Sequence, residues 1–155
     1  MAVKRGEYME FDLENAALEI MTDSVSGSGH DVDVWFRSSQ GSIAGGVELD
    51  ITLFSIPKYA LRGCTGWINL PTDLPSGNHK VFRITKTRTA GTVRVKIECN
   101  DKEVLNTVLS NSACADKYSN DWSQWNEEVT QIKFDKGDIA SDFYRGIWKG
   151  NYVCR

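Results

Sequence analysis

Five residues in one polar segment of the chain carry side chains suited to sugar recognition. Binding a sugar requires an aromatic surface for the apolar side of the ring and planar polar groups that hydrogen-bond its hydroxyls. Both kinds gather around Ser119–Asn126, and the predicted ligand contacts are Tyr118, Asn120, Asp121, Trp122 and Trp125. In an equally weighted alternative, both tryptophans cap the end of a hydrophobic core, because large aromatic side chains are usually buried.

Three aspartates form a second candidate site, in this case for a metal ion. Asp135, Asp138 and Asp142 lie around Gly137 in a short oxygen-rich segment. Calcium takes about six to eight oxygen ligands, and this pattern falls well short of an EF-hand loop. A capped turn is the alternative interpretation. Calcium at these three aspartates is the one cofactor that the sequence brings into consideration, and no other is predicted.

The sequence lacks recognisable catalytic machinery. A nucleotide or S-adenosylmethionine site requires a glycine turn that leads into a helix. The glycine-rich stretches Ser26–Gly29 and Gly45-Gly46 instead lie between expected strands. His30 and His79 fall in turn-like segments, and the chain has no Gly-x-Ser-x-Gly nucleophile elbow. We therefore predict that the protein is not an enzyme.

The centre of the chain predicts a three-stranded antiparallel meander over residues 80–109. Between Thr92 and Cys99 apolar and polar residues alternate, which is typical of a half-buried strand. Thr89-Ala90-Gly91 joins this strand to Val81–Thr87, and the turn Asn100–Glu103 joins it to Val104–Leu109. This meander is the scaffold beside the polar segment.

Further short strands at regular spacing predict an all-β fold. They are expected at Tyr8–Leu13, Ala17–Met21, Val32–Arg37, Val47–Phe54, Cys64–Leu70, Val129–Phe134 and within Phe143–Cys154, with a short edge strand or a turn at Lys58–Arg62. A helix over Leu13–Met21 is the competing assignment for the first part. The pattern is that of an antiparallel β-sandwich of jelly-roll type with little or no helix, forming one domain over residues 1–155. Trp35 and Trp67 are expected in its core.

Four cysteines bear on the cellular compartment. Cys64, Cys99, Cys114 and Cys154 allow three pairings, of which Cys99–Cys114 with Cys64–Cys154 is preferred. The even count favours oxidised cysteines and hence an extracellular, secreted protein whose leader is absent from this chain. Four buried, reduced thiols are the alternative.

Charge and hydropathy exclude two partner classes. The net charge of −3 is unsuited to neutralising a phosphate backbone, so nucleic acid is not an expected partner. No apolar run approaches the roughly 20 residues that span a bilayer, so membrane insertion is not expected. Arg83, Lys86, Arg88, Arg94 and Lys96 form a basic stripe, which we interpret as a solvated outer sheet face rather than a polyanion site.

The strand pattern resembles known extracellular domains. Lys80–Ile84, Val93–Ile97 and the turn Asn100–Lys102 resemble strand pairs of concanavalin-like jelly-roll domains, including laminin-G-type modules. Phe11–Ile20 followed by Asp31–Arg37 is similar to the domain labelled after farnesoic acid O-methyltransferase, found in invertebrate extracellular proteins. Residues 115–155 do not match that domain's tryptophan-rich ending, and no functional residues transfer from either resemblance.

Together these observations predict a lectin-like extracellular recognition module with glycans as partners. The alternative is a structural or protein–protein interaction module of a larger extracellular assembly. A homo-oligomer formed through an exposed strand edge would favour this alternative.

Overall fold

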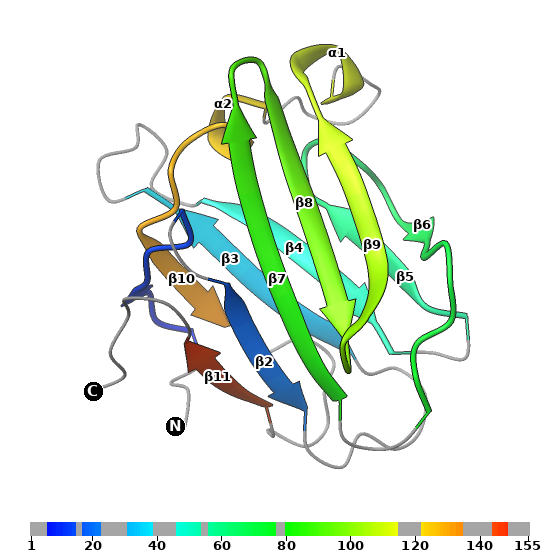
Figure 1. Cartoon of the computed structure of the whole chain (residues 1–155). Coiled ribbons are helices and arrows are strands. Elements are labelled where there is room, and N and C mark those ends of the chain that lie inside the picture. The colour runs from blue at the N-terminus through cyan, green and yellow to red at the C-terminus, as the bar shows by residue number, and fades with distance from the viewer. Residues whose placement is uncertain are drawn as a thin grey trace.

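The strands form two antiparallel sheets that face each other (Figure 1). The computed structural model describes residues 6–14, 17–22, 31–38, 46–53, 56–76, 80–114, 122–134 and 144–148. All strand pairings among them are antiparallel. Helix in the described chain is confined to two short elements. The predicted all-β antiparallel sandwich is confirmed.

One sheet has five strands in the order β11-β2-β7-β8-β9. They are β2 (Leu18–Thr22), β7 (Lys80–Thr89), β8 (Thr92–Cys99), β9 (Lys102–Leu109) and β11 (Tyr144–Trp148). The predicted meander is its centre, since β7, β8 and β9 pair in sequence order. Asn100 and Asp101, with φ of 50° and 67°, make a two-residue hairpin turn between β8 and β9, shorter than expected.

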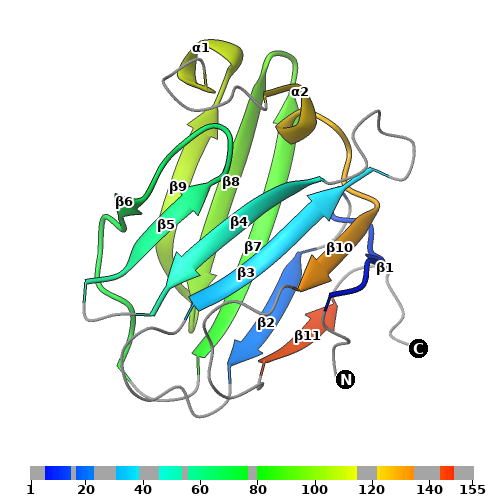
Figure 2. The same ribbon diagram turned by 180° about the vertical axis from the view of Figure 1, so that it is seen from behind.

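The other sheet has six strands in the order β1-β10-β3-β4-β5-β6, and its outer face is toward the viewer in Figure 2. They are β1 (Met9–Glu10), β3 (Asp31–Arg37), β4 (Val47–Thr52), β5 (Lys58–Leu61), β6 (Ile68–Asn69) and β10 (Gln131–Phe134). Because β2 belongs to the five-stranded sheet and both β1 and β3 to the six-stranded one, the chain changes sheet before and after β2. It changes sheet again between β6 and β7, between β9 and β10, and between β10 and β11.

Alternate residues of both sheets fill the space between them. The wholly buried side chains are apolar and come from several strands: Leu18, Ile20, Val34, Phe36, Leu49, Ile51, Phe82, Ile84, Val95, Ile97 and Phe134. Burying one such side chain contributes roughly 1.5–3 kcal/mol. A bulge at Val104, between the pairs Glu98–Glu103 and Ile97–Leu105, lets two consecutive residues of β9 enter the core.

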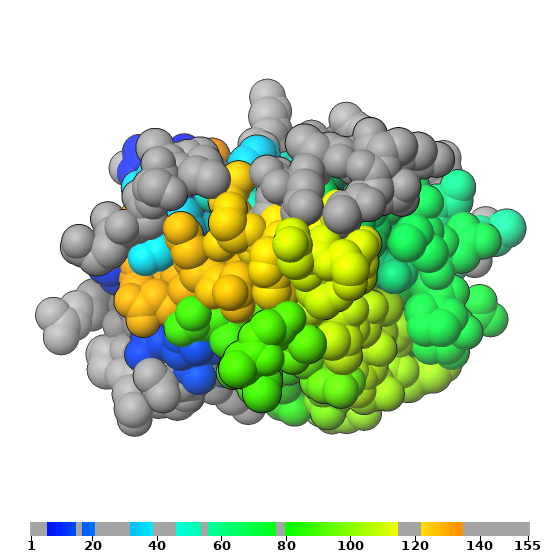
Figure 3. All heavy atoms as spheres, turned by 90° about the horizontal axis from the view of Figure 1, so that it is seen from above, coloured from blue at the N-terminus to red at the C-terminus, as the bar shows by residue number. Residues whose placement is uncertain are grey.

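Two helical turns and a disulfide close one end of the sandwich. They are α1 (Asn111–Cys114) and α2 (Trp122–Trp125). Viewed onto this end, the 122–134 segment (orange) lies beside the residues near α1 (yellow) and the β7–β8 tip (green) (Figure 3). Cys64, which follows β5, is bonded to Cys114 of α1, so the disulfide joins the two sheets.

The predicted cysteine pairings, Cys99–Cys114 and Cys64–Cys154, are both wrong. The intervening strand β9 has eight residues and spans about 27 Å, so it carries the chain from the Cys99 end of the sandwich to the Cys114 end. Cys99 is a buried free thiol, and burial raises its pKa to about 11. Cys154 lies outside the described residues.

The predicted strand Ala17–Met21 is present as β2, whereas two other predicted strands are shorter than expected. The competing helix over Leu13–Met21 is wrong, because Leu18–Thr22 pairs with β7 as a strand. The expected strand Cys64–Leu70 is reduced to Ile68–Asn69, because residues 62–64 form a turn in which Gly63 has φ of 83°. The predicted strand Tyr8–Leu13 is likewise reduced to Met9–Glu10.

Candidate functional site

The predicted sugar-binding loop is only partly described. Tyr118, Asn120 and Asp121 lie outside the described residues and remain predictions. Trp122 and Trp125 begin and end the helical turn α2 rather than lying in an extended segment. Residues three apart share one side of a helix, so both indoles face the same way. Trp122 is partly buried and packs against the core.

Trp125 is a core residue, which corrects its assignment as a ligand contact. Its side chain has 0% exposure and meets the ring of Phe36 edge-on, with the ring centroids 6.4 Å apart. Its indole N–H donates to the carbonyl oxygen of Arg62 at 2.9 Å. A buried indole with its one donor satisfied pins α2 to the end of β5, and it has no face for a sugar.

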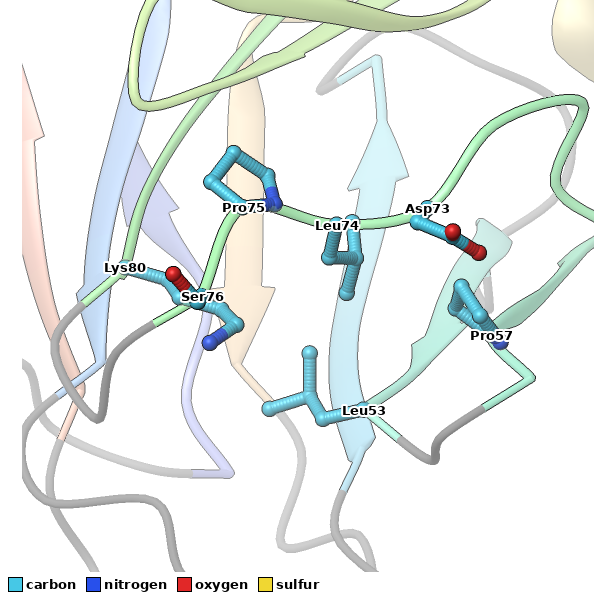
Figure 4. A pocket seen from close by; sticks show the side chains of 7 residues that line it. All are labelled: Leu53, Pro57, Asp73, Leu74, Pro75, Ser76 and Lys80. Carbon is cyan, nitrogen blue, oxygen red and sulfur yellow. The ribbon is translucent and has the colours of Figure 1, made fainter.

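The predicted calcium aspartates, Asp135, Asp138 and Asp142, also lie outside the described residues. A depression of about 240 Å³ occurs at the end of the sandwich away from α1 and α2 (Figure 4). Leu53 and Leu74 point toward each other across it, and Pro57 and Pro75 flank them. Its lining is largely aliphatic and includes no aromatic ring, so it is a poor match to a sugar.

The outer face of the six-stranded sheet holds most of the chemically distinctive side chains. In β3, Val32, Val34 and Phe36 point into the core, so Asp33 and Trp35 point outward. Trp35 is half-buried on this face and is not a core residue. Trp67 is 43% exposed, so its expected core position is wrong as well.

Aromatic rings and cations alternate across one half of this face. The Lys133 Nζ lies 4.7 Å from the centroid of the Trp35 ring and 4.9 Å from that of Tyr8. The guanidinium carbon of Arg37 lies 3.6 Å from the centroid of the Tyr8 ring. Such contacts orient the rings and contribute about 0.5–1 kcal/mol each when exposed. Gly46 permits this packing, because a Cβ at that position would come within 2.6 Å of the Tyr8 hydroxyl.

Tyr8 stays protonated at neutral pH. Partial burial raises the pKa of its phenol above the usual value, and the nearby Arg37 charge opposes that shift without cancelling it. The hydroxyl therefore keeps its proton and is neutral. This half of the face therefore offers rings, cations and a neutral hydroxyl.

Arg62 connects the aromatic surface to a group of carboxylates. Its guanidinium carbon lies 4.8 Å from the centroid of the Trp67 ring. Its Nε donates to Asp50 Oδ2 at 2.6 Å and lies 3.5 Å from Glu48 Oε1. Arg62 is thereby fixed between an exposed indole and two carboxylates.

Asp33, Glu48 and Asp50 form what we call the acidic cluster. Asp33 and Asp50 are directly paired across β3 and β4, and Glu48 is paired with Trp35 one position along the same face. One carboxylate oxygen from each lies within 4.8 Å of the others. Asp33 and Asp50 are only 7% and 2% exposed, although they lie on an outer face. The strand pairing holds these carboxylates together, and the burial of Asp33 and Asp50 distinguishes the cluster from exposed surface acids.

The predicted basic stripe is not a single solvated face. Arg83 is salt-bridged to Glu19 at 2.7 Å, and Lys96 to Glu98 at 3.1 Å, on the outer face of the five-stranded sheet. Lys86 points inward and is 4% exposed, and its Nζ donates to the Glu127 carbonyl oxygen at 2.6 Å. The interpretation against a polyanion site agrees with these pairings, but Lys86 is misplaced in it.

The β3 residues of this face could have been found from alternation. In Val32–Arg37, every second residue is Asp33, Trp35 or Arg37. These three residues point away from the inward-facing valines, so the tryptophan shares a face with charged residues. Trp35 was expected in the core because its side chain is hydrophobic, although its position in the alternation indicates the outer face. The meeting of Asp33 with Asp50 depends on strand register across a long connection, which the sequence does not specify.

Comparison with known proteins adds no family assignment. Neither the protein-family models nor the curated proteins that were searched include a match to this chain.

Proposed function

We propose that the protein is a carbohydrate-binding, lectin-like module that holds a sugar against the outer face of its six-stranded sheet. One observation carries this proposal: the exposed Trp67 indole is oriented by Arg62 beside the carboxylates of Glu48 and Asp50. An indole covers the apolar side of a sugar ring, and oriented carboxylates and guanidinium groups bond its hydroxyls. Trp35 provides a second ring on the same face.

An extracellular setting is part of the proposal. The Cys64–Cys114 disulfide is of the kind that persists in oxidising compartments, where glycans are exposed on cells and matrix. In the portion of the chain that the structure describes, no helix has the length and apolar character to cross a membrane. Tyr118, Asn120 and Asp121 remain predicted contacts from the polar segment.

A glycan array with a matched pair of variants tests the proposal. We expect the wild-type protein to bind a defined set of glycans, and Trp67→Ala to weaken that binding by about tenfold or more, equivalent to about 1.4 kcal/mol. Val108→Ala is the control, because Val108 is 42% exposed but lies on β9 of the other sheet. A blank array, or equal losses in both variants, would contradict the proposal.

A structural or protein-interaction module is the second candidate. Ile56 and Ile68 are 64% and 44% exposed near the β6 edge of the six-stranded sheet, where a further strand could pair. Sedimentation equilibrium separates the two functions. Self-association that is lost in Ile68→Lys, together with a blank glycan array, would favour the interaction module.

A further inference from the structure

The acidic cluster has the geometry of a metal site. Oxygens bound to one calcium ion lie about 2.3–2.6 Å from it, so two of them are separated by at most roughly 5 Å. The carboxylate oxygens of Asp33, Glu48 and Asp50 lie within 4.8 Å of one another and meet this condition together. They come from two adjacent strands, so the backbone ladder fixes their spacing.

A buried oxygen without a donor gives independent support. Asp50 is 2% exposed, and within the described part of the chain its buried Oδ1 atom has no hydrogen-bond partner. Leaving a charged oxygen buried and unsatisfied is costly, so native structures usually provide a proton donor or an ion. Asp50 Oδ2 is already held by Arg62, so Oδ1 is the oxygen that remains for an ion.

We propose that Asp33, Glu48 and Asp50 bind one calcium ion on the outer face of the six-stranded sheet. Each of the three carboxylates offers an oxygen, and water would complete the shell, which matches the hard oxygen ligation that calcium prefers. The cluster has no thiolate or imidazole, the ligands that favour zinc. This site is separate from Asp135, Asp138 and Asp142, and it does not depend on glycan binding.

Arg62 is a positioning residue in this site. Its Nε holds Asp50 Oδ2 at 2.6 Å, and this contact fixes the carboxylate as hydrogen bonds behind metal ligands commonly do. The Arg62 side chain is 45% exposed, and its guanidinium carbon lies 4.8 Å from the centroid of the Trp67 ring, so one arginine contacts both the acidic cluster and the exposed indole.

Calcium titration by calorimetry, with no glycan present, tests the site in the full chain. We expect one ion per chain for the wild-type protein and at least a tenfold weaker affinity for Asp50→Asn. Glu98→Gln is the control, because Glu98 lies on the outer face of the other sheet, and we expect it to bind like wild type. Terbium luminescence sensitised by tryptophan should report the same site, and it should fall in Trp35→Phe while calcium affinity is retained.

Three results would overturn the proposal. They are an absence of heat and of terbium signal at millimolar ion, equal affinity in Asp50→Asn and wild type, and tighter binding of magnesium than of calcium. If Asp50→Asn does not fold, Glu48→Gln, at a half-buried position, takes its place and should show the same tenfold loss. Calcium binding together with a blank glycan array would leave this site standing and reject the proposed function.

Discussion

The two outer faces of the sandwich use charge in different ways. On the five-stranded sheet, acids and bases alternate across strands, so that Arg83 lies between Glu19 at 2.7 Å and Glu98 at 3.4 Å. The hydrogen bond to Glu19 raises the pKa of Arg83 above its usual value. Charges arranged in this way satisfy one another, and the face they form is structural.

On the six-stranded sheet, like charges gather and cations lie over rings. Asp33, Glu48 and Asp50 converge, while Arg37, Arg62 and Lys133 each lie over an aromatic side chain. Convergent carboxylates repel one another and favour an added cation, and oriented rings favour a flat ligand. The arrangement of the charged residues, rather than their number, therefore distinguishes the structural face from the proposed binding face.

Loss of the disulfide is the largest effect we expect, because it connects the sheets that carry the two faces. Closing a loop of 50 residues contributes about 4 kcal/mol in the chain-entropy treatment. The double variant Cys64→Ser, Cys114→Ser should lose about that much unfolding free energy, measured by urea denaturation. Cys99→Ala should keep the Cys64–Cys114 disulfide, which mass spectrometry under non-reducing conditions would detect. A loss of unfolding free energy below about 1 kcal/mol in the double variant would contradict the stabilising role of this disulfide.

Lys86 tests what happens to a basic residue of β7 that points inward. Burial lowers its pKa from 10.5 to about 8, partly opposed by Glu14 and Glu127 and reinforced by Arg88. Between these values the unfolded chain binds more protons than the folded one, so stability should rise with pH from about 8 to 10.5, by up to roughly 3 kcal/mol.

Lys86→Met should remove that rise. The measurement is the urea unfolding free energy at pH 7.5 and at pH 10 for both proteins. Titrating tyrosines are shared, so they cancel in the difference between wild type and variant. Parallel pH profiles for the two proteins would contradict the lowering of the Lys86 pKa by burial.

Arginine variants on opposite faces compare the two arrangements directly. Arg83→Met should cost roughly 2 kcal/mol because Glu19, 7% exposed in its side chain, loses its guanidinium. Arg62→Met should cost a similar amount in calcium-free buffer, since Asp50 is buried too. Added calcium should restore stability to Arg62→Met alone. Equal rescue of both variants, or of neither, would remove the distinction between the faces.

Much of the fold could be predicted from the sequence, because local signals specify it. The meander has clean alternation and turn residues at both joints, and it forms the centre of a sheet as expected. The disulfide could not be predicted in the same way. Nearness in sequence favoured Cys99 as the partner of Cys114, but an eight-residue strand separates the ends of the sandwich on which they lie.

The candidate site was less predictable because it depends on register. Trp35 and Asp33 could be assigned to one face by alternation, whereas the meeting of Asp33 with Asp50 depends on how β3 and β4 align. Arg62 and Trp67 come together only through the turn at Gly63. Composition pointed instead to the tryptophans of α2, of which Trp125 proves to be a structural anchor.

The smallest effect should come from Lys96, whose charge is satisfied on the structural face. Its Nζ lies 3.1 Å from Glu98 and 3.9 Å from Glu103, and its side chain is 39% exposed. Surface pairs of this kind contribute about 1 kcal/mol or less, so Lys96→Gln should change unfolding free energy within that limit. Its retention on a heparin column should equal that of wild type. A clear loss of heparin retention would show that Lys96 binds a polyanion in spite of its ion pairs. The binding surface would then lie on the five-stranded sheet.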